Sequence, residues 1–382
     1  MPLKLKAENK DLETALDIVE FISKTEENSP YFRVKNLDNV GININYIPTS
    51  DCDWDKERFE IQIFENPYLN AENDVFEVYE SSLDERIGWI FPITILESNE
   101  NDFVDTKNLN NYKFIAYKKL LEQNKTVIQK ENFDEFYKLS DIFKDSIICL
   151  FNKNTTNKIP EFDFKNYILS FYDYGYLILD IIPKSKSFYD KTNFLNVMRN
   201  ERKRIVLKKS NFNIYDNDFT KSLFFKEHLL QSDSYLVRFI FLYQIIEYFM
   251  SIEFDKQFEL CLEDYKNKNL VKNDLKENIM TLSKERTLIR DVLNRISLNQ
   301  ELKQLFLQEC KFLFEDIDFT PKKDSLPDKI YDLRNLVVHR LRELTSKQES
   351  LEKILEVFER LIIDILINYE SEDGGKKAEL AI

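Results

Sequence analysis

The sequence predicts an α+β protein, in which a mainly antiparallel β domain with helices is followed by an all-α helical bundle. Short β-rich segments punctuated by Asn, Asp, Ser and Pro occupy much of residues 1–183, as expected for strands joined by turns. From about residue 187 to about 370 the apolar residues recur at helical spacing. The 382 residues, 43% hydrophobic and 32% charged, are enough for two domains of ordinary size.

The first domain is expected to begin with a helix over residues 11–25, because its apolar residues recur at helical spacing. A second helical stretch is expected at about 104–140. The segment 166–183 is expected to form a strand pair that turns at Gly175. The other strands are expected at 31–37, 40–48, 59–65, 74–80, 87–97 and 146–151.

The chain is therefore expected to have four parts. They are an α+β domain at 1–183, a basic helical connector at 184–214, a helical bundle at 215–370 and a mobile tail at 371–382. No phosphate loop, dinucleotide fingerprint or nucleophile elbow occurs in residues 1–183, so the pattern predicts no nucleotide cofactor there.

Several protein classes are disfavoured by composition. The beginning of the chain lacks the basic and apolar pattern of a signal peptide, and no apolar run reaches the roughly 18 residues that span a bilayer. The four cysteines form no CxxC pair, which argues against a zinc site or a disulfide framework. The segment 51–57 resembles the start of an EF-hand loop, but Lys56 stands where Gly is needed, which favours an acidic turn. We expect a cytoplasmic protein that uses no metal, no other cofactor and no membrane.

The net charge of −14 is unevenly distributed. Residues 1–183 hold 20 Lys and Arg against 34 Asp and Glu, whereas 184–382 hold 34 of each. Within 184–209 there are nine basic and two acidic residues, a local stripe that is sufficient for phosphate contacts. Arg202, Lys203 and Arg204 are the candidates for binding phosphates, on a helix that precedes the bundle. A solvated helix face explains the same stripe.

Histidine chemistry has only two possible places in this chain. His228, in FFKEHLL, has no evident partner and is interpreted as a packed or surface residue. His339 lies in DSLPDKIYDLRNLVVHRLREL (324–344), where Pro327 suits the first turn of a helix.

On that late helix, Asp332, Asn335 and His339 fall on one stripe at offsets of three and four. Arg334 lies five positions before His339, about 140° around the axis, and its long side chain can still reach the same cleft edge. The four residues are candidates for one polar site.

An earlier helix, 234–250, supplies a second clue. Its apolar stripe includes Leu236, Phe239, Tyr243 and Met250, and Glu247 falls near the middle of it. A carboxylate there is costly unless it meets a cation or a hydrogen-bond donor, which the late helix can provide. Alternatively the helix is tilted and leaves Glu247 at the rim of the bundle.

The segment RNLVVH (334–339) resembles the RNxxxH form of the HEPN signature, in the right place on a late helix of a bundle. The helix RFIFLYQIIEYF resembles the aromatic, Glu-containing second helix of HEPN domains. The likeness covers about 215–370 and is closest to the Apea-like HEPN proteins of bacterial anti-phage defence. No residue match is claimed for 1–183.

The resemblance implies a HEPN-like fold and a metal-independent endoribonuclease, an RNA-cleaving effector of abortive infection that works as a homodimer through the C-terminal bundle. In it His339 would move a proton, Arg334 would hold the scissile phosphate, and Asn335 would orient a partner or bind the phosphate. Glu247 and Asp332 would support them. Residues 1–183 would sense a trigger, such as a phage-derived molecule, or restrain the nuclease.

Two other hypotheses remain open. A non-catalytic HEPN-like protein would dimerise through the bundle and bind a ligand or protein with its N-terminal domain, which agrees with the net acidity. Alternatively RNLVVH is a coincidence in an unrelated helical protein, and then no up-down bundle would be found.

Overall fold

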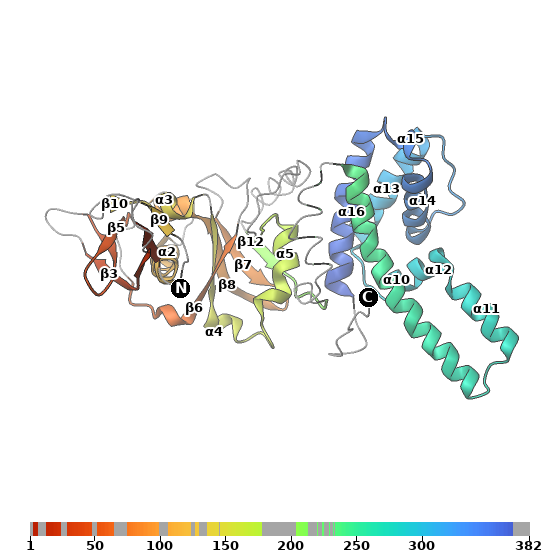
Figure 1. The fold of residues 1–382 in the computed structure, drawn as a ribbon, viewed down its shortest axis with the longest axis horizontal. Coiled ribbons are helices and arrows are strands. Elements are labelled where there is room, and N and C mark those ends of the chain that lie inside the picture. Colours follow the sequence, from red (N-terminus) through yellow and green to blue (C-terminus); the bar gives the residue numbers. More distant parts are fainter. Residues whose placement is uncertain are drawn as a thin grey trace. The chain divides into compact units, whose positions relative to one another are not determined.

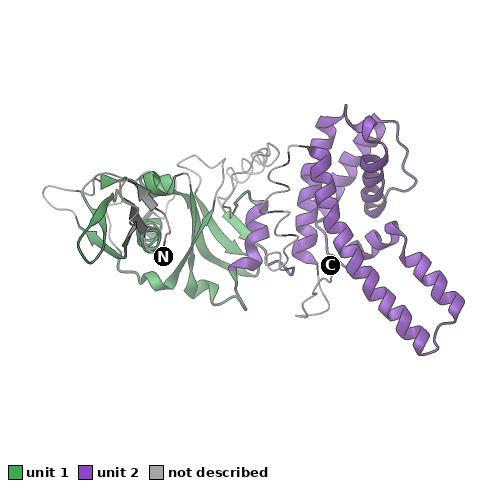
Figure 2. Ribbon diagram, viewed as in Figure 1, with its two compact units in different colours: residues 1–163, 174–180, 191–207 green, residues 164–173, 181–190, 208–382 purple. Residues whose placement is uncertain are grey.

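The structure is a computed structural model of the chain, and it describes residues 3–6, 13–23, 29–47, 52–64, 75–98, 106–123, 127–129, 136–144, 146–177, 204–212, 220, 224, 229, 232 and 234–369. Two compact units are present (Figure 2). The first consists of residues 1–163, 174–180 and 191–207, and the second of 164–173, 181–190 and 208–382. The first is mainly β with helices and the second is a helical bundle, so the predicted α+β fold class is confirmed.

Three sheets make up the first unit. The largest has the order β12-β7-β8-β11-β6, a four-stranded sheet has the order β10-β5-β4-β3, and a three-stranded sheet has the order β2-β1-β9. Most neighbours are antiparallel; β1–β9, β5–β10 and β7–β12 are parallel. The strands are β1 (Leu3–Lys6), β2 (Glu13–Leu16), β3 (Ile18–Ile22), β4 (Tyr31–Lys35), β5 (Gly41–Asn45), β6 (Phe59–Phe64), β7 (Phe76–Glu80), β8 (Leu83–Pro92), β9 (Val127–Gln129), β10 (Phe136–Tyr137), β11 (Ile147–Asn152) and β12 (Arg204–Leu207).

Helix α2 (Thr106–Gln123) lies among these sheets and contacts β1, β3, β6 and β11 (Figure 1). Its apolar residues, with those of the strands, form one continuous buried core. Shorter helical elements complete the unit: η1 (Lys56–Arg58), α1 (Ile93–Leu96), α3 (Leu139–Phe143) and α4 (Lys153–Thr156). Asp55 caps η1 by accepting from the Glu57 N–H at 3.0 Å, as befits the acidic turn expected there.

The helix expected at 11–25 is wrong, because this segment forms β2 and β3 where it is described. Residues Ile18–Ile22 pair antiparallel with Lys35–Tyr31 of β4, and Val19 and Phe21 pack against the core. The apolar residues fit an alternating period as well as a helical one, and the strand partner decides between them.

The strand pair expected at 166–183 is wrong in its first half. Residues Phe164–Tyr167 form a 3-10 turn (η2) and Ile168–Asp173 form α5, a helix whose residues 168–172 are all buried. A short apolar run buried on every side has no diagnostic period, so its length alone does not separate helix from strand. The second half, 178–183, lies outside the described residues. The helical stretch expected at about 104–140 ends at Gln123, and the described residues that follow form β9, β10 and the short helix α3. The strand expected at 87–97 ends at Pro92 and is followed by α1.

The second unit is a helical bundle in which α10 and α13 pack against α16, and α14 packs against α12 and α13 (Figure 1). Its elements besides α5 are α10 (Tyr235–Lys266), α11 (Lys272–Leu282), α12 (Glu285–Asn294), α13 (Gln300–Asp316), α14 (Leu326–His339), α15 (Leu341–Leu344) and α16 (Gln348–Asn368). Helix α16 is the central one, with apolar residues buried along its whole length.

A buried ion pair ties three helices of this unit together. Arg238 of α10 donates to Glu359 of α16 at 2.5 Å, and the side chains are 2% and 4% exposed. Tyr172 of α5 donates to the other oxygen of Glu359 at 2.8 Å. Because a buried charge is costly without such partners, this contact fixes α5 to the bundle.

The basic segment 184–209, predicted to be helical, is described only from residue 204. There it forms strand β12, parallel to β7, with Ile205 and Leu207 buried and Arg204 and Val206 exposed. Arg-Ile-Val-Leu alternates between exposed and buried positions, as a strand with one buried face requires. Arg204 therefore lies on a strand, and not on the expected helix.

Helix α10 is 32 residues long and apolar enough, by length and composition, to cross a membrane. This contrasts with the expectation from apolar runs alone. In the bundle 44% of its most apolar window is buried, and core helices meet the same criterion, so the finding is weak evidence for a span.

Candidate active site

The late helix predicted from the sequence is confirmed as α14. Ser325 is its N-cap, Pro327 lies in its first turn, and Asp328 lies near the positive end of the helix dipole. The apolar side chains of α14 are buried, namely Leu326, Ile330, Leu333 and two later residues. Its polar side chains make the contacts of the site. The helix ends at His339, and the Arg340 N–H bonds to the Leu336 carbonyl at 2.8 Å.

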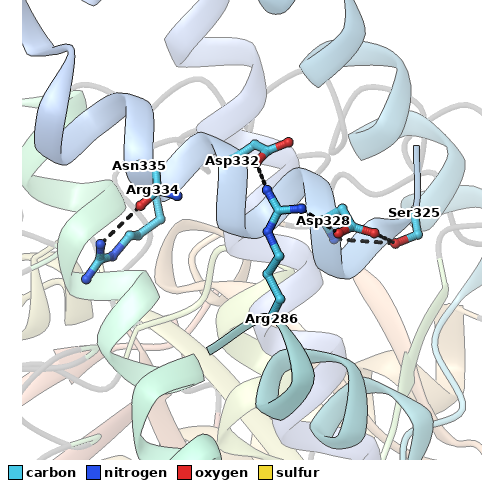
Figure 3. A network of polar contacts seen from close by, with 6 residues as sticks. All are labelled: Arg286, Ser325, Asp328, Asp332, Arg334 and Asn335. Carbon is cyan, nitrogen blue, oxygen red and sulfur yellow. Dashed lines mark hydrogen bonds and ion pairs between the residues drawn. The ribbon is translucent and has the colours of Figure 1, made fainter. Parts of the chain in front are cut away.

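Arg334 and Asn335 lie together on one side of α14 (Figure 3). The Arg334 Nη1 donates to the Asn335 side-chain oxygen at 3.2 Å. Its Nε lies 3.4 Å from Oε1 of Glu285, the first residue of α12. Both charged side chains are about one quarter exposed, at 27% and 25%, so Arg334 is partly open to solvent.

Tyr243 of α10 completes the contact around Arg334. Its hydroxyl donates to the same Oε1 of Glu285 at 2.5 Å. Burial, the hydrogen bond to Glu285 and the charge of that carboxylate all raise the pKa of Tyr243, so it stays a neutral donor. Tyr243 and Glu285 were not recognised from the sequence as site residues.

Glu247 stands one turn after Tyr243 on α10 and is exposed at the rim of the bundle, and the charge of a cation on α14 also acts on it, so the two alternatives hold together. Burial raises the pKa of its carboxyl; the positive charge of Arg334 lowers it and the charge of Glu285 raises it. These interactions place Glu247 in the electrostatic field of Arg334. Of the two carboxylates, Glu285 is the one in contact with Arg334.

Asp332 belongs to a different contact. Arg286, the residue after Glu285 on α12, donates to Asp332 and lies 3.0 Å from Asp328 (Figure 3). The two aspartate side chains are 5% and 2% exposed. Burial raises the pKa of Asp332, while Arg286 lowers it. Asp332 therefore anchors α14 to α12.

His339 is exposed at the last position of α14. Within the described part of the chain it makes no hydrogen bond or ion pair. Asn335 lies four residues before His339 on α14, at the predicted offset, and its side chain accepts a hydrogen bond from Arg334. One bundle by itself thus holds the arginine and leaves the histidine open to solvent.

The proposed basic contacts are only partly described. Arg202 and Lys203 lie outside the described residues, as does His228. The Arg204 Nε lies 3.4 Å from Glu77, and its guanidinium lies 4.5 Å from the ring centre of Tyr79. Both partners are in β7 of the first unit, so Arg204 is already engaged there.

Over the ranges that the structure describes, no group of three or more His, Cys, Asp or Glu side chains is arranged to hold a metal ion. The four cysteines are free thiols. The chemistry available on α14 is that of a guanidinium, an amide and an imidazole, which are groups that bind an anion and move a proton.

The helical bundle thus carries an Arg-Asn pair and a helix-terminal His on α14. Residues 241–368, about a third of the chain, match the sequence model of the family described as Apea-like HEPN. The match lies in the C-terminal part, where the RNLVVH segment predicted a likeness to this family, and it argues against a coincidental motif. Searches of curated proteins and of solved structures found no match.

Proposed function

We propose that this protein is a metal-independent HEPN-type endoribonuclease, an effector of anti-phage defence by abortive infection in the cytoplasm. One observation carries the proposal: the family match over 241–368 includes α14, with Arg334, Asn335 and His339 at the spacing of the signature. HEPN domains are commonly ribonucleases, and they often dimerise and bind RNA.

The residue types fit transesterification of RNA. The ribose 2′-hydroxyl attacks the adjacent phosphorus, its proton passes to a base, and the 5′-oxygen leaves with a proton from an acid. The products are a 2′,3′-cyclic phosphate and a 5′-hydroxyl end. His339 would take or give one of these protons, and Arg334 would stabilise the charge on the phosphoryl oxygens.

A homodimer through the bundle supports this chemistry, because His339 and Arg334 are not joined within one copy. A second α14 facing the first would supply further groups and shield the exposed imidazole from water. Residues 1–183 would then sense the trigger or restrain the nuclease, which agrees with their excess of acidic over basic residues.

The test compares the full-length wild type with His339→Ala, Arg334→Ala and His228→Ala on single-stranded RNA and on DNA of the same sequence. EDTA is present throughout. We expect the wild type and His228→Ala to cleave RNA but not DNA, leaving cyclic phosphate ends. The cleavage rate of His339→Ala and Arg334→Ala should fall at least 100-fold, the lower end of general acid–base contributions of about 10²–10⁴. The same set expressed during phage infection tests the defence role by growth and RNA integrity.

Two results would refute the proposal that this protein is a ribonuclease. If wild type and His339→Ala degrade RNA equally, the activity comes from elsewhere. If the wild type leaves RNA intact both in vitro and in infected cells, the binding-only alternative stands.

A further inference from the structure

The surroundings of Arg334 are unusual for a residue that must receive a phosphate. Its guanidinium is in contact with Glu285, and Glu247 lies in the same electrostatic neighbourhood. The ionised carboxylate of Glu285 offsets the positive charge of Arg334, so an RNA phosphate that approaches Arg334 meets a weakened attraction.

The contact between Arg334 and Glu285 is suited to being displaced. Oε1 of Glu285 lies 3.4 Å from Nε of Arg334, an ion pair without a close hydrogen bond, and both side chains are partly exposed. Pairs of this kind are weak. Among the described residues, Nη2 of Arg334 has no hydrogen-bond partner, so one amino group can meet a phosphate oxygen first.

Glu285 is nevertheless held where it is. The Tyr243 hydroxyl bonds to the same oxygen that faces Arg334. On the backbone, the next residue is Arg286, whose two carboxylate contacts fix the start of α12 against α14. Displacing Glu285 from Arg334 thus requires only a side-chain rotation, while the helices stay in place.

We propose that Glu285, held by Tyr243, restrains Arg334 by competing with the RNA phosphate for the guanidinium. This rests on the proposed function and names an acidic restraint within its site. Glu285 is a positioning residue: it keeps Arg334 in one orientation and lowers its affinity for an anion. Neutralising Glu285 raises RNA affinity, and the gain depends on Arg334.

The experiment measures binding of fluorescently labelled single-stranded RNA to the full chain in a His339→Ala background, which prevents cleavage. Glu285→Gln is expected to tighten binding on the order of fivefold, the effect of an exposed ion pair of about 1 kcal/mol. Tyr243→Phe leaves the charge and frees the carboxylate, so it should tighten binding less. Glu285→Asp keeps the charge but draws the carboxylate back from Arg334 and Tyr243, so it should tighten binding less than Glu285→Gln.

Controls separate this effect from general electrostatics. Glu277 on α11 is exposed and has no ion pair among the described residues, so Glu277→Gln makes the same charge change away from Arg334. In an Arg334→Ala background, Glu285→Gln should give no gain. A gain in affinity is also an outcome that misfolding does not produce, and circular dichroism checks the helix content of each variant.

The restraint is refuted if Glu285→Gln binds RNA no better than the parent, if Glu277→Gln gives the same gain, or if the gain persists without Arg334. Cleavage by the wild type decides which proposal has failed. If the wild type cleaves RNA but Glu285→Gln does not change RNA affinity, only the proposed restraint is refuted. If no variant binds RNA and the wild type does not cleave it, both the restraint and the proposed ribonuclease function are refuted.

Discussion

The contact between α12 and α14 allows a quantitative test, Arg286→Ala. Arg286 is 29% exposed, but its partners Asp328 and Asp332 are 2% and 5% exposed. Removing the guanidinium leaves two buried carboxylates without their cation. Breaking a buried ion pair costs about 3–5 kcal/mol, and partial exposure of Arg286 lowers the value, so we expect a loss of about 3 kcal/mol in the free energy of unfolding at pH 7.

The matched control is Arg290→Ala, one turn further along the same helix. Arg290 is exposed and has no ion pair within the described part of the chain, so its replacement should cost less than about 0.5 kcal/mol. Urea unfolding followed by circular dichroism reports the helical unit. Both tryptophans lie in the first unit, so their fluorescence follows that unit separately. With a slope of about 2 kcal/mol per molar urea, the midpoint should fall by about 1.5 M.

The pH dependence of this loss has a definite sign. Burial already raises the pKa of Asp332, and Arg286 opposes the rise, so without Arg286 the folded-state pKa moves higher. A raised folded-state pKa contributes stability below the unfolded value, and that contribution is lost as pH rises through the folded value. The destabilisation should therefore shrink as pH falls toward the ordinary aspartate value of 3.8. Equal losses for Arg286→Ala and Arg290→Ala, or a loss that grows in acid, would refute the reasoning.

Three further outcomes are expected. Arg238→Met should lower the unfolding free energy by about 3–5 kcal/mol in the same urea assay, because its buried partner on α16 loses its cation; a smaller loss than that of Arg286→Ala would contradict the burial argument. RNA affinity should rise as pH falls through the raised pKa of Glu247, whose charge acts on Arg334 with that of Glu285, and Glu247→Gln should flatten the titration. Mixing Arg334→Ala with His339→Ala protomers should restore up to about a quarter of wild-type cleavage if each site combines two copies, since half the dimers are mixed and one of their two sites is intact.

Long helices with clear ends could be predicted from the sequence. In α14 the serine cap, the proline of the first turn and the apolar series agree with one another, and the structure confirms them. Agreement among independent local signals is what made these elements predictable.

Short apolar segments could not be assigned in the same way. Residues 168–172 are buried on every side against α16 and its neighbours, and 18–22 acquire their strand partner from β4. In both cases the local pattern is compatible with a helix and with a strand, and tertiary packing determines the backbone conformation.

The candidate site was predictable only along one helix. Arg334, Asn335 and His339 stand within six consecutive residues, and the motif finds them. Glu285 and Tyr243 belong to other helices and have no motif of their own, so only the fold brings them to Arg334. Asp332 lies on the predicted stripe of α14, but its partner is a cation 46 residues earlier in the chain, which the motif does not contain.

The contrast between Arg334 and His339 explains why one copy of α14 is an incomplete site under the proposed function. Arg334 is oriented by Asn335 and Glu285 of its own bundle, so the anion-binding group is prepared in a single chain. His339 has no described partner to orient its ring, and proton transfer requires a group held within hydrogen-bond reach of the reacting atom. The missing orientation must come from RNA, from a second bundle or from both. A second bundle that covers His339 would also exclude water, and assembly would then complete a site in which Arg334 is already in place.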